Sequence, residues 1–262
     1  MWKILSDWLA LIERHLLHLR RIRQRLIALT LLPTVFTLVF GVLFGSVISV
    51  PGGGYQEFVM AGIFLQLMLS SVPNSAIGAI EDLRTGLVDR FRSLPMAGSA
   101  VLVGRSVGDT TVRAISCVPM SAVGLLIGWR VHTGALGLLA GFAVLLAFGL
   151  VMAWVGALVG LVSGTPETAA SLPGLILMPA MFLSNAFIPL AGLPEWLRAI
   201  AVWNPLSAVV GAARELWGNP AALVSDAFPV VHPLLASAIW LVLIMAVVAP
   251  LAIRRYRTAT VH

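Results

Sequence analysis

Charged side chains are scarce in this sequence of 262 residues. They make up 11% of it, against about 25% in an ordinary soluble domain, whereas hydrophobic residues make up 59% and the mean hydropathy is +0.98. This composition has too few polar residues for a soluble globular protein or for a disordered one, and it therefore excludes both classes. Because the apolar residues lie in long uncharged runs, the sequence predicts an all-α membrane protein that crosses the bilayer several times.

Cysteine and lysine are nearly absent as well. The single cysteine, Cys117, excludes a framework of disulfides within the chain. The single lysine, Lys3, excludes a phosphate-binding loop of the form GxxxxGK followed by Ser or Thr, because that loop needs a lysine directly after its second glycine. We therefore expect no ATPase site in this chain, so a transporter built on it could not use ATP alone.

Six runs of low charge are long enough to span a membrane, since about 20 residues rising about 1.5 Å each cover the roughly 30 Å of a bilayer core. The predicted spans are 26–50, 58–80, 107–129, 135–162, 168–190 and 234–253. The third span is the least apolar because it contains Asp109 and Arg113. These two residues stand one helical turn apart, so a structural pair is expected, and a role in transport is the alternative.

Residues 1–25 combine apolar and basic positions in a helical pattern. Apolar side chains recur every three or four residues from Trp2 to Leu19, and arginines gather toward Arg25. This pattern predicts an amphipathic helix that lies in the membrane interface. A solvated helix packed against a soluble partner is the alternative.

The basic residues are distributed unequally over the segments between the spans. With both termini in the cytoplasm, thirteen Lys and Arg residues would lie inside and three, Arg130, Arg198 and Arg214, outside. This bias predicts that both termini are cytoplasmic, including the tail 254–262. It also accounts for the net charge of +6 without a nucleic-acid partner.

The stretch 191–229 is too apolar for a plain loop. Prolines divide it into short pieces, and its tryptophans, Trp196, Trp203 and Trp217, are typical of the headgroup level of a membrane. We expect two short re-entrant helices that dip into the outer leaflet, with protein or water covering their irregular backbone.

Glycines recur four residues apart in several spans. Such spacing lets helix backbones approach closely, and we expect it to serve packing within one bundle more than contact between copies. The sets are Gly41 and Gly45, Gly124 and Gly128, Gly137 and Gly141, and Gly156, Gly160 and Gly164.

Two short patterns in the sequence match enzyme motifs in residue type and spacing, but not in their surroundings. The run from Gly104 to Gly108 matches the GxSxG pattern of hydrolases, but it enters a membrane span instead of the strand-to-helix turn that this chemistry needs. His15 and His18 lie three apart, as metal ligands can, without a third ligand on their shared face. We therefore expect no catalytic and no metal-binding residue in this chain.

The segment 81–105 is too polar to enter the bilayer and too short to be a domain. From Leu87 to Leu94 its apolar and basic residues follow helical spacing, and Pro95 ends the pattern. We expect a short amphipathic helix across the membrane face, which could act as a lever against a soluble partner. A solvated connecting helix is the alternative.

Two sets of residues give the sequence a family resemblance. The first is a glutamate at the end of the second span, a glycine step, a basic and apolar helix and a Leu-Pro end. The second is the run FLSNAFIP from Phe182 to Pro189, followed by LPEWL at 193–197 and WNPL at 203–206. In these features the chain resembles the permease subunits of type-two ABC exporters, the family that includes the daunorubicin-resistance permeases. The resemblance covers essentially the whole chain.

The resemblance implies six transmembrane helices in a type V ABC exporter-like fold. Residues 1–25 would be a connecting helix along the membrane, 86–95 a coupling helix that docks into a groove of the ATPase, and 191–229 the re-entrant outer helices. The residues implied in ATPase coupling are Glu81, Arg84, Gly86, Leu87, Arg90, Phe91, Leu94 and Pro95. Among them, Glu81 would pair with an arginine of residues 1–25.

A substrate path between the second and fifth spans is implied in the same way. Its residues would be Gln66, Asn74, Met181, Phe182, Asn185 and Phe187. Phe and Met surfaces with a few amide groups favour an amphiphilic drug, antibiotic or lipid-like molecule as the cargo.

The expected function is therefore that of the permease subunit of an ABC exporter in a bacterial plasma membrane. Two separate ATPase subunits would hold ATP and Mg²⁺, and this chain would bind no cofactor itself. A second permease, either a copy of this chain or a close relative, would complete the transporter among the membrane lipids. The alternatives are an exporter of a polysaccharide or glycolipid and, less in keeping with the sequence, an ion-coupled carrier, which would need mid-span carboxylates and an internal repeat.

Overall fold

The regular elements of the computed structural model are all helices. The structure describes residues 34–45, 52–84, 98–220 and 225–258, together with positions 31, 48 and 50. Within these residues no strand is formed, and the one β-type contact is an isolated bridge between Val50 and Gly53. The predicted all-α class is confirmed for the described part of the chain.

The helices follow one another in the order expected from the apolar runs. The first half of the chain contains η1 (Val39–Phe44), α3 (Tyr55–Leu69), α4 (Ser71–Arg84) and α6 (Gly98–Leu126). The second half contains α7 (Gly134–Val162), α8 (Pro166–Phe182), η2 (Leu190–Gly192), α9 (Glu195–Trp203), α10 (Pro205–Trp217), α11 (Phe228–Val231) and α12 (Pro233–Thr258).

Three helices in the described residues are long and apolar enough to cross a membrane. They are the joined pair α3–α4 (Tyr55–Arg84), α7 (Gly134–Val162) and the Pro233–Tyr256 part of α12. The helix α6 is as long as α7 but contains charged residues, and α8 has only 17 residues. Several long apolar helices in one chain are typical of a polytopic membrane protein.

The helices α3 and α4 are separated only by Ser70. Pro73 has no N–H to donate, so the regular hydrogen-bond pattern is interrupted one turn before it. Hydroxyl groups occupy the carbonyls of this turn: Ser70 donates to Leu67 O and Ser71 donates to Met68 O, both over 2.6 Å. The result is one interrupted helix across the whole bundle.

The helix α8 ends earlier than the predicted span 168–190. It begins at Pro166, where the Thr165 side chain accepts a hydrogen bond from the Thr168 N–H, and it ends at Phe182. Beyond it, the Ser184 hydroxyl donates to Met181 O (2.5 Å) and accepts from the Ala186 N–H (3.2 Å). These local bonds replace the helical pattern, so the last part of the predicted span is a series of turns.

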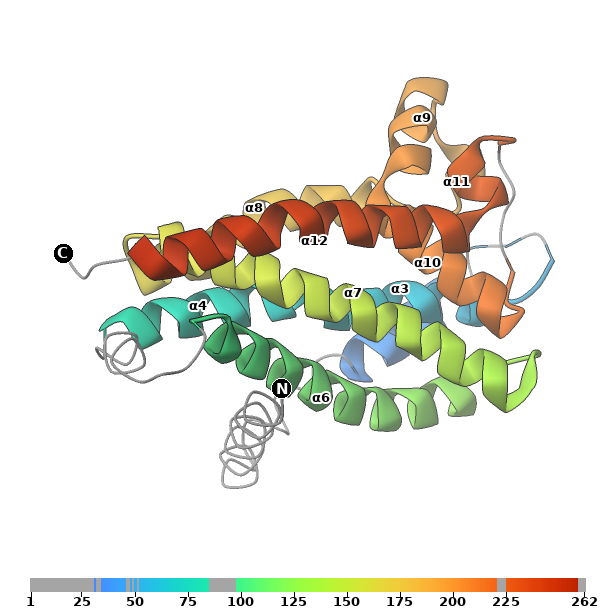
Figure 1. Cartoon of the computed structure of the whole chain (residues 1–262). Coiled ribbons are helices and arrows are strands. Elements are labelled where there is room, and N and C mark those ends of the chain that lie inside the picture. Colours follow the sequence, from blue (N-terminus) through green and yellow to red (C-terminus); the bar gives the residue numbers. More distant parts are fainter. Residues whose placement is uncertain are drawn as a thin grey trace.

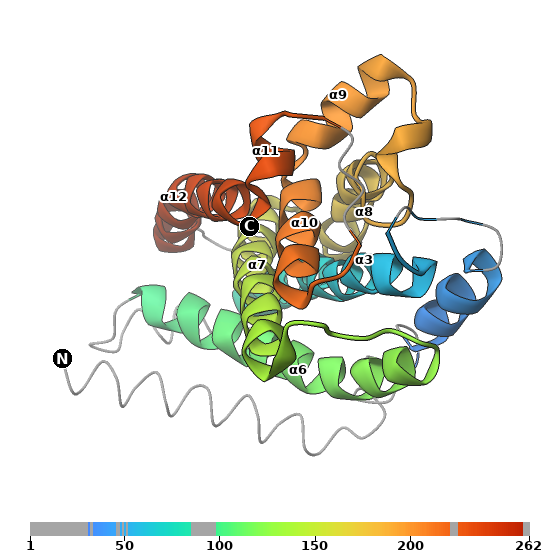
Figure 2. The ribbon, with the colours of Figure 1, turned by 90° about the vertical axis from the view of Figure 1, so that its right-hand side faces the viewer.

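The helix α7 is the centre of the bundle. It contacts α3, α4, α6, α8, α10 and α12. Seen along the helices, α7 lies in the middle, with α6 below it, α12 on one side and α3 and α8 on the other (Figure 2). The elements are therefore arranged around α7.

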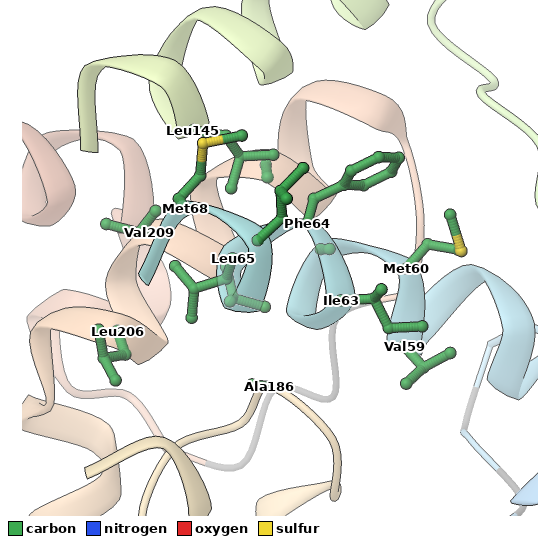
Figure 3. Packing of buried hydrophobic residues seen from close by; sticks show 14 of the residues in the cluster. Val59, Met60, Ile63, Phe64, Leu65, Met68, Leu145, Ala186, Leu206 and Val209 are labelled. Carbon is green, nitrogen blue, oxygen red and sulfur yellow. The ribbon is translucent and has the colours of Figure 1, made fainter. Parts of the chain in front are cut away.

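The core is formed mainly by α3, which is buried on all sides. Its side chains Phe58, Ile63, Phe64 and Met68 are almost inaccessible, and they pack with Leu145 of α7. Figure 3 shows this packing, with Ala186 below α3 and with Leu206 and Val209 of α10 beside it. By contrast, α12 exposes most of its apolar surface: 11% of its most apolar window is buried, against 72% for α3–α4.

Some of the glycines spaced four apart serve packing inside the bundle, as expected, whereas Gly128 and Gly164 meet no atom within 4 Å. Added Cβ atoms at Gly156 and Gly160 of α7 would overlap the main-chain carbonyls of Val72 and Ala76 in α4. At Gly141 the added atom would overlap the indole ring of Trp217 in α10. These glycines let α7 lie directly against the backbone of α4 and the end of α10.

The two ends of the bundle carry different residues. At the end on the left in Figure 1, α4 and α12 finish and α6 and α8 begin. These parts of the four helices contain Arg84, Arg254, Arg105 and Glu167, and this end is called the basic end. The opposite end contains Trp129, Trp196, Trp203 and Trp217 and is called the tryptophan end; α9, α11 and the α6–α7 turn lie there. Successive long helices run between these ends in alternating directions (Figure 1).

Candidate functional site

Residues predicted for coupling lie at the basic end of the bundle. Glu81 and Arg84 are on the last turn of α4, and both side chains are exposed. The other six, Gly86, Leu87, Arg90, Phe91, Leu94 and Pro95, lie outside the described residues, as does the segment 1–25. Their roles, and the pairing of Glu81 with residues 1–25, stay predictions.

An ion pair that the sequence analysis missed lies beside Glu81. Arg105 of α6 donates to the carboxylate of Asp82 in α4. Gly78 makes room for it, because a Cβ there would overlap the Arg105 guanidinium. The sequence signal was the pair of opposite charges on either side of the segment between α4 and α6. The ion pair connects the end of α4 to the start of α6.

The start of α8 adds an acidic group to the basic end. Hydrogen bonds from its own backbone N–H and from the Thr165 side chain, with a smaller contribution from the charge of Arg84, lower the pKa of Glu167. This carboxyl is exposed. It therefore stays charged at neutral pH and attracts the end of α4.

One of the two charges inside α6 joins this helix to α4, and the other bonds within α6. The Ser75 hydroxyl of α4 donates to the carboxylate of Asp109 over 2.8 Å. Arg113 is buried and donates to the main-chain oxygen of Asp109 over 3.0 Å. The expected closeness of Asp109 and Arg113 is present through that main-chain oxygen, and the geometry supports the structural role.

Four residues predicted for the substrate path surround the end of α8. Met181 and Phe187 are buried, Asn185 is half-buried and Phe182 is 61% exposed. The rings of Phe182 and Phe187 are 6.5 Å apart. The structure brings these four together where the helix gives way to turns.

The two path residues on the second span lie on α3 and α4. Gln66 in α3 and Asn74 in α4 are half-buried, and the Asn74 amide donates to Ser70 O over 2.9 Å. The helices α4 and α8 touch through Ala76 and Ala169. The second and fifth predicted spans therefore lie side by side in the fold of this single chain.

A row of phenylalanine rings extends the surface around Phe187. Phe187 stacks on Phe40 at 4.8 Å between ring centroids, and Phe40 stacks on Phe36 at 5.6 Å and on Phe44 at 5.2 Å. Phe36, Phe40 and Phe44 were not predicted as site residues, although their spacing of four in an apolar run was a usable signal. The row links the first apolar run to the end of α8.

Asn204, the residue before α10, and Tyr55 of α3 hold the carbonyl groups at the end of α8. The Asn204 amide donates to Ala180 O (2.7 Å) and Leu183 O (2.9 Å), while its oxygen accepts from the Leu206 N–H at the start of α10. From α3, the Tyr55 hydroxyl donates to Phe187 O over 3.0 Å. In an apolar surrounding such partners are required where a helix breaks, because water does not satisfy the backbone.

Arg214 makes three more of these connections. Its guanidinium donates to Phe58 O of α3 (2.9 Å), to Asn185 O (2.8 Å) and to Ala186 O (3.2 Å), and it lies 3.6 Å above the ring of Phe58. The side chain is 1% exposed, and in the described residues its polar partners are carbonyl oxygens, with no carboxylate among them. Arg214 thus joins α10, α3 and the turns after α8. The prediction from charge bias placed it outside the membrane and gave no sign of this burial.

A second set of hydrogen bonds connects the elements at the tryptophan end. The indole N–H of Trp129 donates to Asn219 Oδ1 (2.9 Å), and the Asn219 amide donates to Arg130 O (2.6 Å). The indole N–H of Trp217 donates to Leu138 O over 3.2 Å, and its ring meets that of Trp129 at 5.1 Å. The α6–α7 turn is therefore bonded to the end of α10.

The described residues contain no group of three His, Cys, Asp or Glu side chains placed to hold a metal ion. The polar groups of this site are main-chain carbonyls, amides, hydroxyls and arginines. Such an arrangement can position helices and bind an amphiphilic molecule through rings and isolated polar atoms.

Comparisons with known proteins cover most of the chain. Residues 6–216 match the model of the family described as "ABC-2 type transporter". The daunorubicin resistance ABC transporter permease protein DrrB1 of Streptomyces coeruleorubidus is 32% identical over 91% of this chain and 81% of its own length. The probable doxorubicin resistance ABC transporter permease protein DrrC of Mycobacterium tuberculosis is 24% identical over 88% and 81%. The putative transport permease ycf38 of Porphyra purpurea is 25% identical over 83% and 76%.

Proposed function

Because the chain belongs to the ABC-2 type transporter family, we propose that it is the transmembrane subunit of an exporter whose ATPase is a separate chain. The observation that carries the proposal is the similarity to a drug-resistance permease over 91% of the sequence. Relatives named for daunorubicin and doxorubicin resistance support an amphiphilic drug, antibiotic or lipid-like cargo. Export of such a molecule would give the cell resistance to it.

The proposed topology has six membrane spans in a type V exporter-like arrangement. The alternating directions of the long helices and the short helices α9 and α10 support it (Figure 1). Arg84, Arg105, Arg254 and Arg255 lie at the basic end, which we assign to the cytoplasm together with both termini. The membrane would be the plasma membrane of a bacterium.

Two ATPase subunits would dock at the basic end. Glu81 and Arg84 are exposed there, directly before the segment 86–95, which we propose as the coupling helix. Residues 1–25 would be the connecting helix. ATP and Mg²⁺ would be held by the ATPase, since this chain has no phosphate-binding loop of its own.

A second permease would pack against the exposed apolar face of α8. That face presents Leu175, Ile176, Met178 and Phe182, each more than half exposed in the single chain. The path would run between the two subunits at this face. Whether the second subunit is a copy or a relative changes nothing in this arrangement.

The proposed mechanism uses ATP to move the two permeases against each other. Closure of the ATPase pair would draw the two coupling segments together, and the path would change from inward-facing to outward-facing. Transport requires that the cargo bind the two states with different affinity.

A polysaccharide or glycolipid cargo is the second candidate. The row of rings at Phe36, Phe40, Phe44 and Phe187 offers flat apolar contacts and few polar groups. This surface favours the drug-like cargo, since sugars need many hydrogen-bond partners as well as rings.

The test is co-purification with the partner ATPase. Phe91→Asp and Arg90→Glu should abolish docking of the ATPase while the permease still inserts in the membrane at normal yield. Arg198→Glu, at the tryptophan end, is the control and should leave docking intact. Normal ATPase yield with either of the first two variants would show the coupling assignment to be wrong. Uptake of cargo into liposomes by the permease alone, driven by an ion gradient, would show that the transporter class is wrong.

A further inference from the structure

The helix α12 has one face packed on the bundle and one face that is exposed. Near its end, Ala252 and Tyr256 are buried in a cluster with residues of α4, α6 and α7. Over the whole of its most apolar window, however, only 11% is buried. Figure 2 shows α12 on the side of α7 opposite to α3 and α8. A second permease on the α8 face would therefore cover a different side of the chain.

The exposed apolar residues of α12 lie along one face. They recur at every fourth position, which brings them to the same side of a helix. They are 45–60% exposed and are together called the α12 stripe: Leu235, Ile239, Leu243, Val247 and Leu251. The stripe runs from the tryptophan end toward the basic end, so it can contact acyl chains over the thickness of a membrane.

Two arginines continue the α12 stripe at the basic end. Arg255 stands four residues after Leu251, and Arg254 is next to it; both are exposed. In the part of the chain that the structure describes, neither guanidinium forms an ion pair with a carboxylate. Arg105, at the same end, pairs with Asp82 instead. The end of the stripe therefore carries two positive charges that an anion can reach.

The length of the uncharged part of α12 sets the level of these charges in the membrane. The segment 234–253 contains no charged residue, and its 20 residues, rising about 1.5 Å each, cover about the 30 Å of a bilayer core. Arg254 and Arg255 follow directly, so their guanidinium groups reach the layer of lipid phosphates. An anionic phospholipid matches both parts of this surface, because it joins apolar chains to a negative headgroup.

We propose that α12 binds an anionic phospholipid at the basic end, with the phosphate at Arg254 and Arg255 and the acyl chains along the α12 stripe. A guanidinium donates parallel hydrogen bonds to a phosphate, and each basic residue close to the membrane surface adds to the attraction for anionic lipid. The proposal goes beyond export, since it requires only that α12 spans a membrane. It gives Arg254 and Arg255 a ligand of defined chemistry.

An acidic surface of the ATPase is the other partner that these arginines could meet. The segment 86–95, proposed for docking of the ATPase, continues from α4, whereas the arginines continue the exposed stripe of α12. Their place at the end of a lipid-facing stripe favours the phospholipid. The experiments below separate the two partners.

The first experiment measures lipid binding at equilibrium. The full-length chain is reconstituted in phosphatidylcholine vesicles, and the share of a spin-labelled lipid that the protein surface immobilises is measured. Spin-labelled phosphatidylglycerol should associate about threefold more strongly than spin-labelled phosphatidylcholine, and this preference should fall as salt is raised. Equal association of the two lipids with the wild type would overturn the proposal.

The second experiment locates the preference on α12. The double variant Arg254→Gln, Arg255→Gln should reduce the threefold preference to about 1.5-fold, while Arg254→Lys, Arg255→Lys keeps the charge and should retain most of it. The matched control is Arg130→Gln, Arg198→Gln, which removes the same charge at the tryptophan end from arginines that donate to main-chain oxygens. It should leave the preference unchanged. An equal loss in the two glutamine pairs would show an effect of net charge alone and would refute a site on α12.

The third measurement separates the phospholipid from the ATPase. The variant Arg254→Gln, Arg255→Gln should still co-purify with the ATPase at normal yield. Loss of the ATPase with an unchanged preference for phosphatidylglycerol would assign the arginines to the ATPase and contradict the proposal. If the double variant does not accumulate in the membrane, Arg254→Gln alone decides the question, with an expected preference of about twofold. A wild-type chain that binds no ATPase would contradict the proposed function, whereas its lipid preference tests this inference separately.

Discussion

The tryptophan end and the basic end of the bundle are held together by different forces. At the tryptophan end, most connections are bonds from neutral side chains and one buried arginine to main-chain atoms of other elements, as Asn204, Arg214 and Asn219 make, and a contact of His132 with the Glu57 carboxylate lies beside them. At the basic end, the connection is an ion pair between Asp82 and Arg105, whose side chains are 30% and 19% exposed. Buried bonds to the main chain are specific and insensitive to salt, whereas a partly exposed ion pair is weak and screened.

This difference matches the demands of the proposed transport cycle. The basic end is where an ATPase would dock, and an interface that must move with each cycle gains from connections that break and re-form easily. The tryptophan end carries the broken helix α8 and the short helices, whose backbone must be satisfied at all times. The four predictions below test the contrast, starting with the largest expected effect.

Trp217→Ala should destabilise the tryptophan end most. The ring is fully buried, meets Phe64 and Trp129 at 5.7 Å and 5.1 Å, and its N–H satisfies Leu138 O. We expect a loss of about 3 kcal/mol or more in the free energy of unfolding. Thermal unfolding of the purified permease in detergent measures it. Trp196→Ala, which removes an exposed indole from α9, is the control and should change stability little.

Gly160→Ala should separate α7 from α4 along the middle of the bundle. Its Cβ would overlap the carbonyl of Ala76, so the two helices must move apart, at a cost of about 2 kcal/mol. The same substitution at Gly174 of α8 meets no atom within 4 Å. It should be neutral or stabilise by up to about 1 kcal/mol through helix propensity. Equal behaviour of the two variants in thermal unfolding would argue against the close contact.

Asn219→Ala should weaken the α6–α7 turn without disturbing the core. It removes the acceptor of the Trp129 N–H and the donor to Arg130 O, and we expect a loss of about 1–2 kcal/mol. Asn219→Asp keeps the acceptor for Trp129 and should recover part of this loss. Hydrogen exchange of the amides in residues 127–133 would show the turn opening more often in Asn219→Ala.

Asp82→Asn should have the smallest effect on stability. A double-mutant cycle with Arg105→Gln is expected to give a coupling energy below about 1 kcal/mol, and the value should fall as salt is raised. A coupling energy of several kcal/mol that is unchanged by salt would show that the connection at the basic end is as strong and as insensitive to salt as those at the tryptophan end.

The sequence predicted the helical class and the order of the helices well, because long apolar runs have few alternatives. It also predicted that glycines such as Gly156 and Gly160 serve packing within the bundle, and their contacts with α4 confirm it. Two short helices in the outer segment were expected, and α9 and α10 are present. These features depend on local pattern and can be recognised without tertiary contacts.

The features that depend on distant partners were not visible in the sequence. The end of α8 at Phe182 lies in an uncharged run, so hydropathy extended the predicted span to 190. Arg214 was counted as an outer loop residue, because its carbonyl partners on α3 and after α8 are 156, 29 and 28 residues away in sequence. Charge counts record that an arginine exists but do not record which backbone groups it satisfies.

The candidate site shows the same difference between features that the sequence indicates and features that depend on distant partners. The residues Phe182, Asn185 and Phe187 were selected through a family resemblance, and the structure places them around the break in α8. Their support by Ser207 and Arg214 follows only from three-dimensional contacts. A family resemblance can therefore select residues near the break in α8, but it does not show which residues hold them.

The single cysteine has a practical consequence. Cys117 is 5% exposed and packs in the main core cluster, where a water-soluble thiol reagent cannot reach it. Any cysteine introduced at the surface would then be the one reactive thiol of the chain, without prior removal of a native residue. Pairs of such cysteines on the α8 faces of two subunits would report, by the rate at which they cross-link, how far the two halves of the transporter separate in each nucleotide state.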